Sequence, residues 1–139
     1  MSTISLNLSS LVKPEEIAEF DFEGLDGFTV KLCYLGRDKL NKLRKDCVVR
    51  KISRGEVDET LDLVKFNTMY SKDVVRGWSG LKLSYVSQLM LVGIPEGSDM
   101  DSELEYTPEN AEALLKHSTH FDKFVSDTLA DLSNFTKHG

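Results

Sequence analysis

Histidine and acidic side chains are the groups in this sequence that come closest to a metal site. His117 and His120 stand three residues apart, a spacing that can bring two imidazoles onto one metal ion, but no cysteine or carboxylate pattern completes a ligand set. The acids of residues 98–105 lack the spacing of an EF-hand calcium loop. We therefore expect no bound metal, and we interpret residues 98–105 as a solvated acidic loop.

Nucleophilic chemistry has no clear signature in the sequence. The two cysteines, Cys33 and Cys47, form neither a CxxC pair nor a disulfide framework. Cys33 falls in a strand pattern and Cys47 on the apolar side of a helix pattern, so both are expected to be small core residues. The chain has no G-x-G-x-x-G, P-loop, G-x-S-x-G or H-E-x-x-H motif. Because no nucleophile stands in an activating context, we expect a protein without a cofactor that is not an enzyme.

Charge is distributed unevenly along the chain, whose formal net charge is −6. Residues 31–54 contain nine Lys or Arg and two acids, whereas residues 95–139 contain ten acids and three bases. A basic block can mark nucleic-acid binding, but the whole chain is acidic and the block lacks glycine–aromatic interleaving, so we expect no nucleic-acid partner. The block can instead be a solvated helix face, or it can steer head-to-tail self-association with the acidic half of another copy.

Length and composition fit one globular domain. The chain has 139 residues, of which 40% are hydrophobic and 29% are charged. No stretch approaches the roughly 20 apolar residues of a membrane span, and the N-terminus has neither the basic nor the apolar part of a secretory signal. We therefore expect a cytosolic protein with no membrane partner. The expected organisation is an arm over 1–17 with one helical turn beginning at Pro14, a single domain over 18–135 and a tail over 136–139.

Two periodicities predict the secondary structure of this domain. Apolar residues that alternate over 19–35, around a glycine-rich turn, predict an antiparallel β-hairpin. Helical spacing of apolar residues predicts helices over 38–52, 58–76, 108–117 and 118–135. The third of these helices begins with Thr107 as N-cap and Pro108 at the first position, whereas residues 81–94 fit either a strand or a helix. The predicted fold class is α+β, an N-terminal antiparallel β-hairpin packed against a bundle of about four helices.

Two of the predicted helices carry extensive apolar surface. The helix over 58–76 has one apolar stripe that extends to Trp78 and another that contains Phe66 and Tyr70. The last helix has a continuous stripe from Phe121 to Phe135, which is the strongest amphipathic pattern in the chain. Each stripe can be core packing or a surface on which a partner docks.

Several short motifs follow one another along the chain. A phenylalanine-rich hairpin leads into a basic helix, Trp78-Ser79-Gly80-Leu81 follows the central helix, and Tyr106-Thr107-Pro108-Glu109-Asn110 begins a helix that contains Leu114-Leu115. The order of these motifs resembles that of the tail assembly chaperones of siphophages, and the resemblance covers about residues 18–135. In those proteins a W-x-G-hydrophobic step and a Y-[ST]-x-E-N…LL helix start recur. The other segments that carry the resemblance are 35–40 (LGRDKL), 43–47 (LRKDC), 62–67 (DLVKFN) and 121–135.

The resemblance implies a role in virion morphogenesis in the host cytoplasm. Such chaperones bind the long helical tape measure protein before the tail tube polymerises, help to recruit tail tube protein, and leave as the tube closes. The alternative function is a phage-encoded adaptor or inhibitor that binds a host protein. The candidate partner contacts are Phe66, Tyr70, Trp78, Arg44, Lys45, Arg50 and Lys51. For the three aromatic residues, core packing is the alternative.

Overall fold

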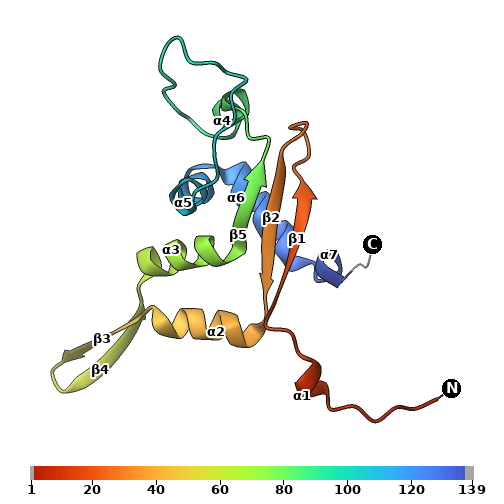
Figure 1. The fold of residues 1–139 in the computed structure, drawn as a ribbon. Helices are drawn as coiled ribbons and strands as arrows, with labels where there is room; N and C mark the ends of the chain where they lie inside the picture. Colours follow the sequence, from red (N-terminus) through yellow and green to blue (C-terminus); the bar gives the residue numbers. More distant parts are fainter. Residues whose placement is uncertain (1, 137–139) are drawn as a thin grey trace.

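The computed structural model describes residues 2–136 and has an α+β fold, in which an antiparallel sheet packs against helices (Figure 1). The fold class predicted from the sequence is therefore confirmed. In chain order the elements are α1 Leu8–Leu11, β1 Glu15–Asp21, β2 Thr29–Leu35, α2 Arg37–Asp46, β3 Val48–Ser53, β4 Glu56–Leu61, α3 Leu63–Val74, β5 Val75–Ser79, α4 Leu83–Leu89, α5 Pro108–His117, α6 Thr119–Ala130 and α7 Ser133–Thr136.

The predicted N-terminal hairpin forms two strands of a three-stranded antiparallel sheet with the order β1-β2-β5. Strands β1 and β2 are paired from Glu15–Leu35 to Asp21–Thr29. The sequence-distant strand β5 adds to the other side of β2, with Val30 opposite Trp78. Strand β2 is therefore central, which explains why its apolar residues Val30 and Leu32 are fully buried.

The core lies between this sheet and helix α6. Phe121 of α6 is fully buried, and its ring stacks near those of Phe22 and Phe28 in the hairpin, at centroid distances of 6.2 and 6.4 Å. The helix begins where the sequence predicts, because the Ser118 hydroxyl accepts a hydrogen bond from the Phe121 backbone N–H. Helix α5 likewise begins with Thr107 as N-cap and Pro108 at its start, as predicted.

The helix predicted over 38–52 is shorter than expected, and its second half is a strand. Helix α2 ends at Asp46, and β3 begins at Val48. Two consecutive β-branched residues, Val48 and Val49, follow the helix, and such residues favour extended backbone. Cys47, at the helix C-cap, is buried as expected, and so is Cys33.

The helix predicted over 58–76 is also wrong at both ends. Its first residues form β4, which pairs with β3, and its last residues form β5. Helix α3 between them begins at Leu63, and the carboxylate of Asp62 caps it by accepting a hydrogen bond from the Lys65 backbone N–H. Arg54 and Gly55 both have positive φ and connect Ser53 to Glu56, which is the geometry of a two-residue hairpin turn rather than of a helix end.

Both ends of the described chain differ from prediction. The last apolar stripe is not one helix, because the chain leaves α6 after Ala130 and turns before α7, so that Phe135 packs on the rings of Phe20 and Tyr34. In the N-terminal arm the helical turn lies at Leu8–Leu11, not at Pro14. Strand β1 begins at Glu15, so the sheet includes the last residues of the segment expected to be an arm.

The ambiguous segment over 81–94 contains a helix, α4. The loop after α4 returns to Leu81, whose carbonyl accepts a hydrogen bond from the Leu104 backbone N–H at 2.7 Å. Leu81 is fully buried beneath this loop. The acidic residues between 96 and 105 therefore belong to a loop that is tied back to the end of the sheet, although most of their side chains are exposed.

Candidate protein-binding surface

A pocket of about 450 Å³ lies among helices α3, α5 and α6. Phe66 and Tyr70, which are one helical turn apart on α3, stack with ring centroids 5.6 Å apart and an interplanar angle of 19°. Both rings are only partly buried. The complete lining is Val64, Phe66, Asn67, Tyr70, Ser71, Glu112, Leu115, Lys116 and Asp122. The structure thus places two of the predicted contact residues together on one open surface, which is partly apolar and partly polar.

Polar groups stand around the stacked rings. Glu112 of α5 accepts a hydrogen bond from the Thr68 hydroxyl of α3 at 2.6 Å, which holds the two helices together beside the pocket. Burial raises the pKa of the Tyr70 phenol, and the negative charge of Asp122 raises it further. Tyr70 is therefore neutral at physiological pH and can act as an apolar ring with a hydrogen-bonding hydroxyl.

The sequence pattern identified the α3 side of this pocket but not the residues opposite it. Leu115 was expected only as a packing residue of its own helix, and neither Glu112 nor Asp122 was singled out. No local signal could have found them, because they line the pocket only through the way α5 and α6 pack against α3.

Trp78 lies apart from the pocket, in β5. Its indole N–H donates a hydrogen bond to the Leu104 carbonyl at 3.0 Å, and its ring meets Tyr106 edge-on with centroids 5.1 Å apart. The ring also packs against the hydrophobic core. Trp78 therefore links the sheet to the loop before α5. This position matches the alternative of core packing that the sequence left open for it. Trp78 does not lie beside Phe66 and Tyr70.

The four predicted basic contacts lie on two different elements. Arg44 and Lys45 are exposed on the last turn of α2, whereas Arg50 and Lys51 are exposed on β3. Arg50 pairs with Glu59 of β4 at 3.1 Å. The basic block read from the sequence is thus split, and part of its charge is compensated within the β3–β4 hairpin.

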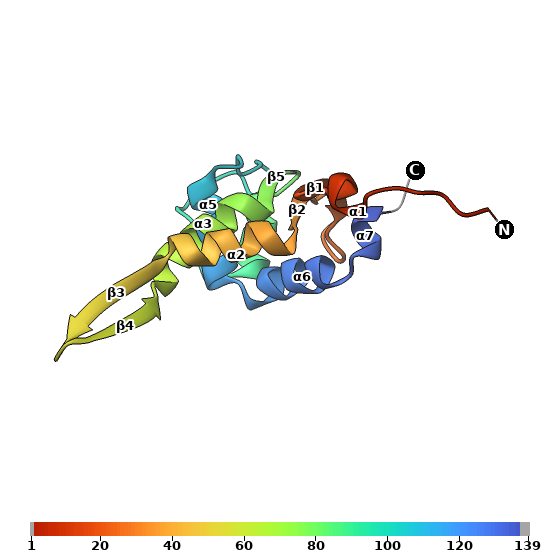
Figure 2. The ribbon, with the colours of Figure 1, turned by 90° about the horizontal axis from the view of Figure 1, so that it is seen from below.

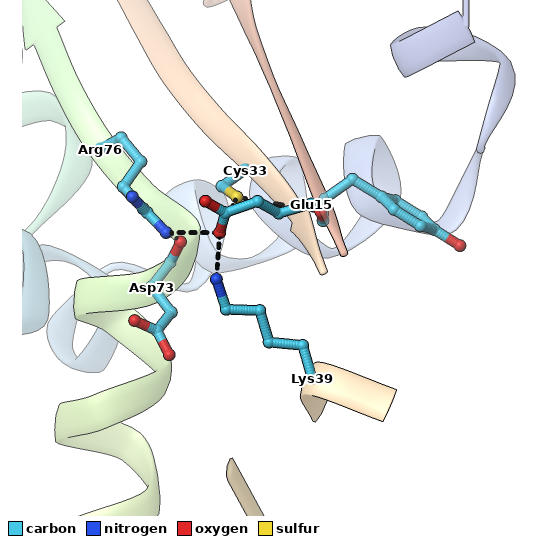
Figure 3. A network of polar contacts seen from close by, with 6 residues as sticks. Glu15, Cys33, Lys39, Asp73 and Arg76 are labelled. Carbon is cyan, nitrogen blue, oxygen red and sulfur yellow. Dashed lines mark hydrogen bonds and ion pairs between the residues drawn. The ribbon is translucent and has the colours of Figure 1, made fainter. Parts of the chain in front are cut away.

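A second polar cluster surrounds Glu15 at the start of β1 (Figure 3). The Glu15 carboxylate accepts hydrogen bonds from Lys39 of α2 and, at 3.0 Å, from Arg76 of β5. Cys33 of β2 lies against the same carboxylate, with its Sγ atom 3.5 Å from Oε2. One side chain therefore joins the edge of the sheet to α2, although the cations that hold it are 24 and 61 residues away.

The pKa shifts of Glu15 and Cys33 are those of a structural ion-pair network. The hydrogen bond from Lys39 lowers the pKa of Glu15, partial burial opposes that effect, and Cys33 and Arg76 lower the pKa further. Burial raises the pKa of the Cys33 thiol to about 11. The glutamate is therefore charged and the thiol is protonated at neutral pH, so Cys33 lacks the thiolate character of a reactive cysteine.

We expect Glu15→Gln to lower stability at pH 7, with a difference from the wild type that shrinks in acid. Because the folded-state pKa of Glu15 is below the unfolded value, its stabilisation is fully present above about pH 4.5 and is lost as the pH falls through the folded value. Urea denaturation of both proteins between pH 7 and pH 3 measures this. Glu19→Gln, on the exposed face of the same strand, is the control. A constant difference at all pH values would contradict the prediction.

Two further findings concern residues 2–136. No three His, Cys, Asp or Glu side chains in this part of the chain are grouped so that they could hold a metal ion. None of its helices combines the length and the apolar character needed to cross a membrane.

Comparison with known proteins identifies no relative. No protein-family model matches the chain, no curated protein matches it significantly, and no solved structure does so either. The choice among functions therefore rests on the sequence motifs and on the geometry described above.

Proposed function

We propose that this protein is a phage tail assembly chaperone that binds the tape measure protein and helps to recruit tail tube protein in the host cytoplasm, without remaining in the mature virion. It acts by binding other polypeptides and not by catalysis. The observation that carries the proposal is the pocket that the stacked rings of Phe66 and Tyr70 line among three helices.

The pocket has the features of helix-in-groove recognition. Phe66, Tyr70 and Leu115 offer apolar contacts, and charged groups at Glu112, Lys116 and Asp122 stand among them. Amphipathic helices bind such grooves through apolar residues spaced by three or four positions. A tape measure protein, being long and helical, offers many segments of this kind, so one groove can serve repeated sites along a single client.

The order of sequence motifs supports the same function independently of the pocket. The W-x-G step at Trp78 lies at the end of the sheet, and the helix start at Tyr106 packs against it through the edge-on ring contact. These two motifs therefore lie side by side, and Tyr106 also donates a hydrogen bond to the Val75 carbonyl at 2.5 Å.

Co-expression with a tape measure protein tests the proposal. The wild-type chain is expected to keep that client soluble and to co-purify with it. Phe66→Ala is expected to weaken binding about tenfold or more, because truncation of a central aromatic contact commonly costs about 2 kcal/mol. Binding is measured by isothermal calorimetry with client fragments of about 30 residues.

Leu91→Ala is the matched control, since Leu91 is a fully exposed apolar residue outside the pocket. It should bind the client as well as the wild type does. Near-ultraviolet circular dichroism of Phe66→Ala should remain that of a folded protein, because Phe66 is outside the buried core. Failure of the wild-type chain to bind any client segment, together with capture of a compact host factor, would favour the adaptor or inhibitor instead.

A further inference from the structure

The β3–β4 hairpin extends away from the rest of the molecule (Figures 1 and 2). All twelve residues of its two strands are exposed. At its base, the Asp62 backbone N–H donates to the Cys47 carbonyl at 2.8 Å, so the hairpin leaves the body between α2 and α3. A two-stranded hairpin on its own is marginally stable in water, so this exposed hairpin is a candidate for contact with another chain.

The two faces of the hairpin differ in polarity. Residues paired across an antiparallel ladder point to the same face, and successive residues alternate between faces. By the observed register, the apolar hairpin face consists of the pairs Val48–Leu61, Arg50–Glu59 and Ile52–Val57. The polar hairpin face consists of Val49–Thr60, Lys51–Asp58 and Ser53–Glu56.

The apolar hairpin face is exposed in the part of the chain that the structure describes. Ile52 is 80% exposed and Val57 is 59% exposed, and Val48 and Leu61 are also exposed. A strand pair that sorts its apolar residues onto one face normally buries that face. Residues 2–136 leave Ile52 and Val57 largely uncovered, so a surface that buries these two side chains would come from outside the described residues.

The charges of the hairpin indicate which kind of partner surface is complementary to the apolar hairpin face. The segment 48–61 contains three bases and three acids, so the hairpin as a whole is neutral despite the basic sequence around it. The only charged groups on its apolar face are Arg50 and Glu59, which are paired with each other at 3.1 Å. A strongly acidic or basic partner would therefore gain nothing here, whereas an apolar surface with one balanced ion pair is complementary.

A second copy of the chain presents such a surface. We propose that two copies form a two-fold symmetric dimer by packing their apolar hairpin faces together. An interface of this symmetry brings the same patch to both sides, so Arg50 of each copy meets Glu59 of the other while the aliphatic side chains of Ile52 and Val57 are buried between them. The dimer goes beyond the proposed function and forms without the client. It differs from the head-to-tail self-association considered from the sequence, because the same hairpin face lies on both sides of the interface.

Charge reversal tests the interface. By sedimentation velocity, Arg50→Glu and Glu59→Arg should each raise the dimer dissociation constant about tenfold or more, because like charges then face each other across the axis. An equimolar mixture of the two variants should dimerise again, because each cation then faces an anion. Lys51→Glu, with the same charge change on the polar hairpin face, is the matched control and should dimerise as the wild type does.

Neutral substitutions keep the test independent of hairpin folding. Ile52→Thr retains a β-branched residue but removes apolar surface from the apolar hairpin face, and it should weaken the dimer. Val49→Thr makes a similar change on the polar hairpin face and should not. The proposal is overturned if the wild type stays monomeric at all concentrations, or if the variants of the apolar hairpin face behave like their controls.

The same variants separate this proposal from the proposed function. Arg50→Glu should lose dimerisation and retain client binding in the pocket, whereas Phe66→Ala should lose client binding and retain dimerisation. If the wild-type chain is monomeric and Arg50→Glu loses client binding, the apolar hairpin face belongs to the client and the dimer is overturned. Absence of client binding by a wild-type dimer would leave the dimer standing and remove the chaperone function.

Discussion

Phe121→Ala is expected to lower the free energy of unfolding by about 3–5 kcal/mol, which is the usual cost of truncating a buried phenylalanine. Phe121 is fully buried, and its ring lies beside those of Phe22, Phe28 and Phe124. Alanine would remove the side chain that joins α6 to the hairpin and leave a cavity that the rigid sheet cannot fill. Because a domain of this size is stable by only about 5–15 kcal/mol, much of its stability would be lost.

Urea denaturation followed by circular dichroism measures this loss. Leu91→Ala removes a leucine side chain that is fully exposed, so it should change the free energy of unfolding by less than about 0.5 kcal/mol. Phe121→Leu should recover part of the loss, since it retains apolar volume at the site. A cost for Phe121→Ala as small as that of the control would show that α6 does not cover the sheet as described.

Gly80→Ala is the second substitution with a large expected effect, about 3 kcal/mol or more. Gly80 follows β5 with a φ of +76°, and a Cβ atom there would lie 2.8 Å from the carbonyl carbon of Gly27 and closer still to its oxygen. Left-handed backbone costs an alanine roughly 1–2 kcal/mol, and forcing an extra atom into packed surroundings costs roughly 1–3 kcal/mol more. The clash is with backbone, which cannot rotate away.

Gly97→Ala separates these two contributions. Gly97 has a φ of +83°, similar to that of Gly80, but no atom lies within 4 Å of the position its Cβ would take. It should therefore show the backbone cost alone, about 1–2 kcal/mol in the same denaturation experiment. Equal costs at Gly80 and Gly97 would mean that the turn at Gly27 can move aside and that β5 is held less tightly against the hairpin than the structure indicates.

Local sequence signals predicted the elements whose boundaries depend on nearby backbone. The alternation of apolar residues over β2 predicted a strand because side chains alternate faces with period two. The cap at Thr107 predicted the start of α5, since its hydroxyl accepts a hydrogen bond from an N–H only three residues away. Helical spacing predicted a helix from residue 118, close to the observed start of α6. These features needed no knowledge of the tertiary structure.

The β3–β4 hairpin shows where a local signal was present but misinterpreted. The helical spacing of Leu40, Leu43 and Cys47 was extended through residue 52, although consecutive β-branched residues follow Cys47 and a glycine stands at residue 55. The abundance of Lys and Arg favoured a solvated helix in that interpretation. In the structure, one of those charges, Arg50, is instead compensated across the hairpin by Glu59.

By itself, the sequence determined the α+β class, the N-terminal hairpin, the starts of α5 and α6 and the apolar side of α3 that holds Phe66 and Tyr70. Only the tertiary structure decided that α5 and α6 complete a pocket beside them, that Trp78 points inward, and that Glu15 joins α2 to the sheet. Periodicity and caps report on residues within a turn or two of each other, whereas these features depend on side chains brought together from distant segments. The path that brings them together is set by the packing of the whole chain, and no local pattern records it.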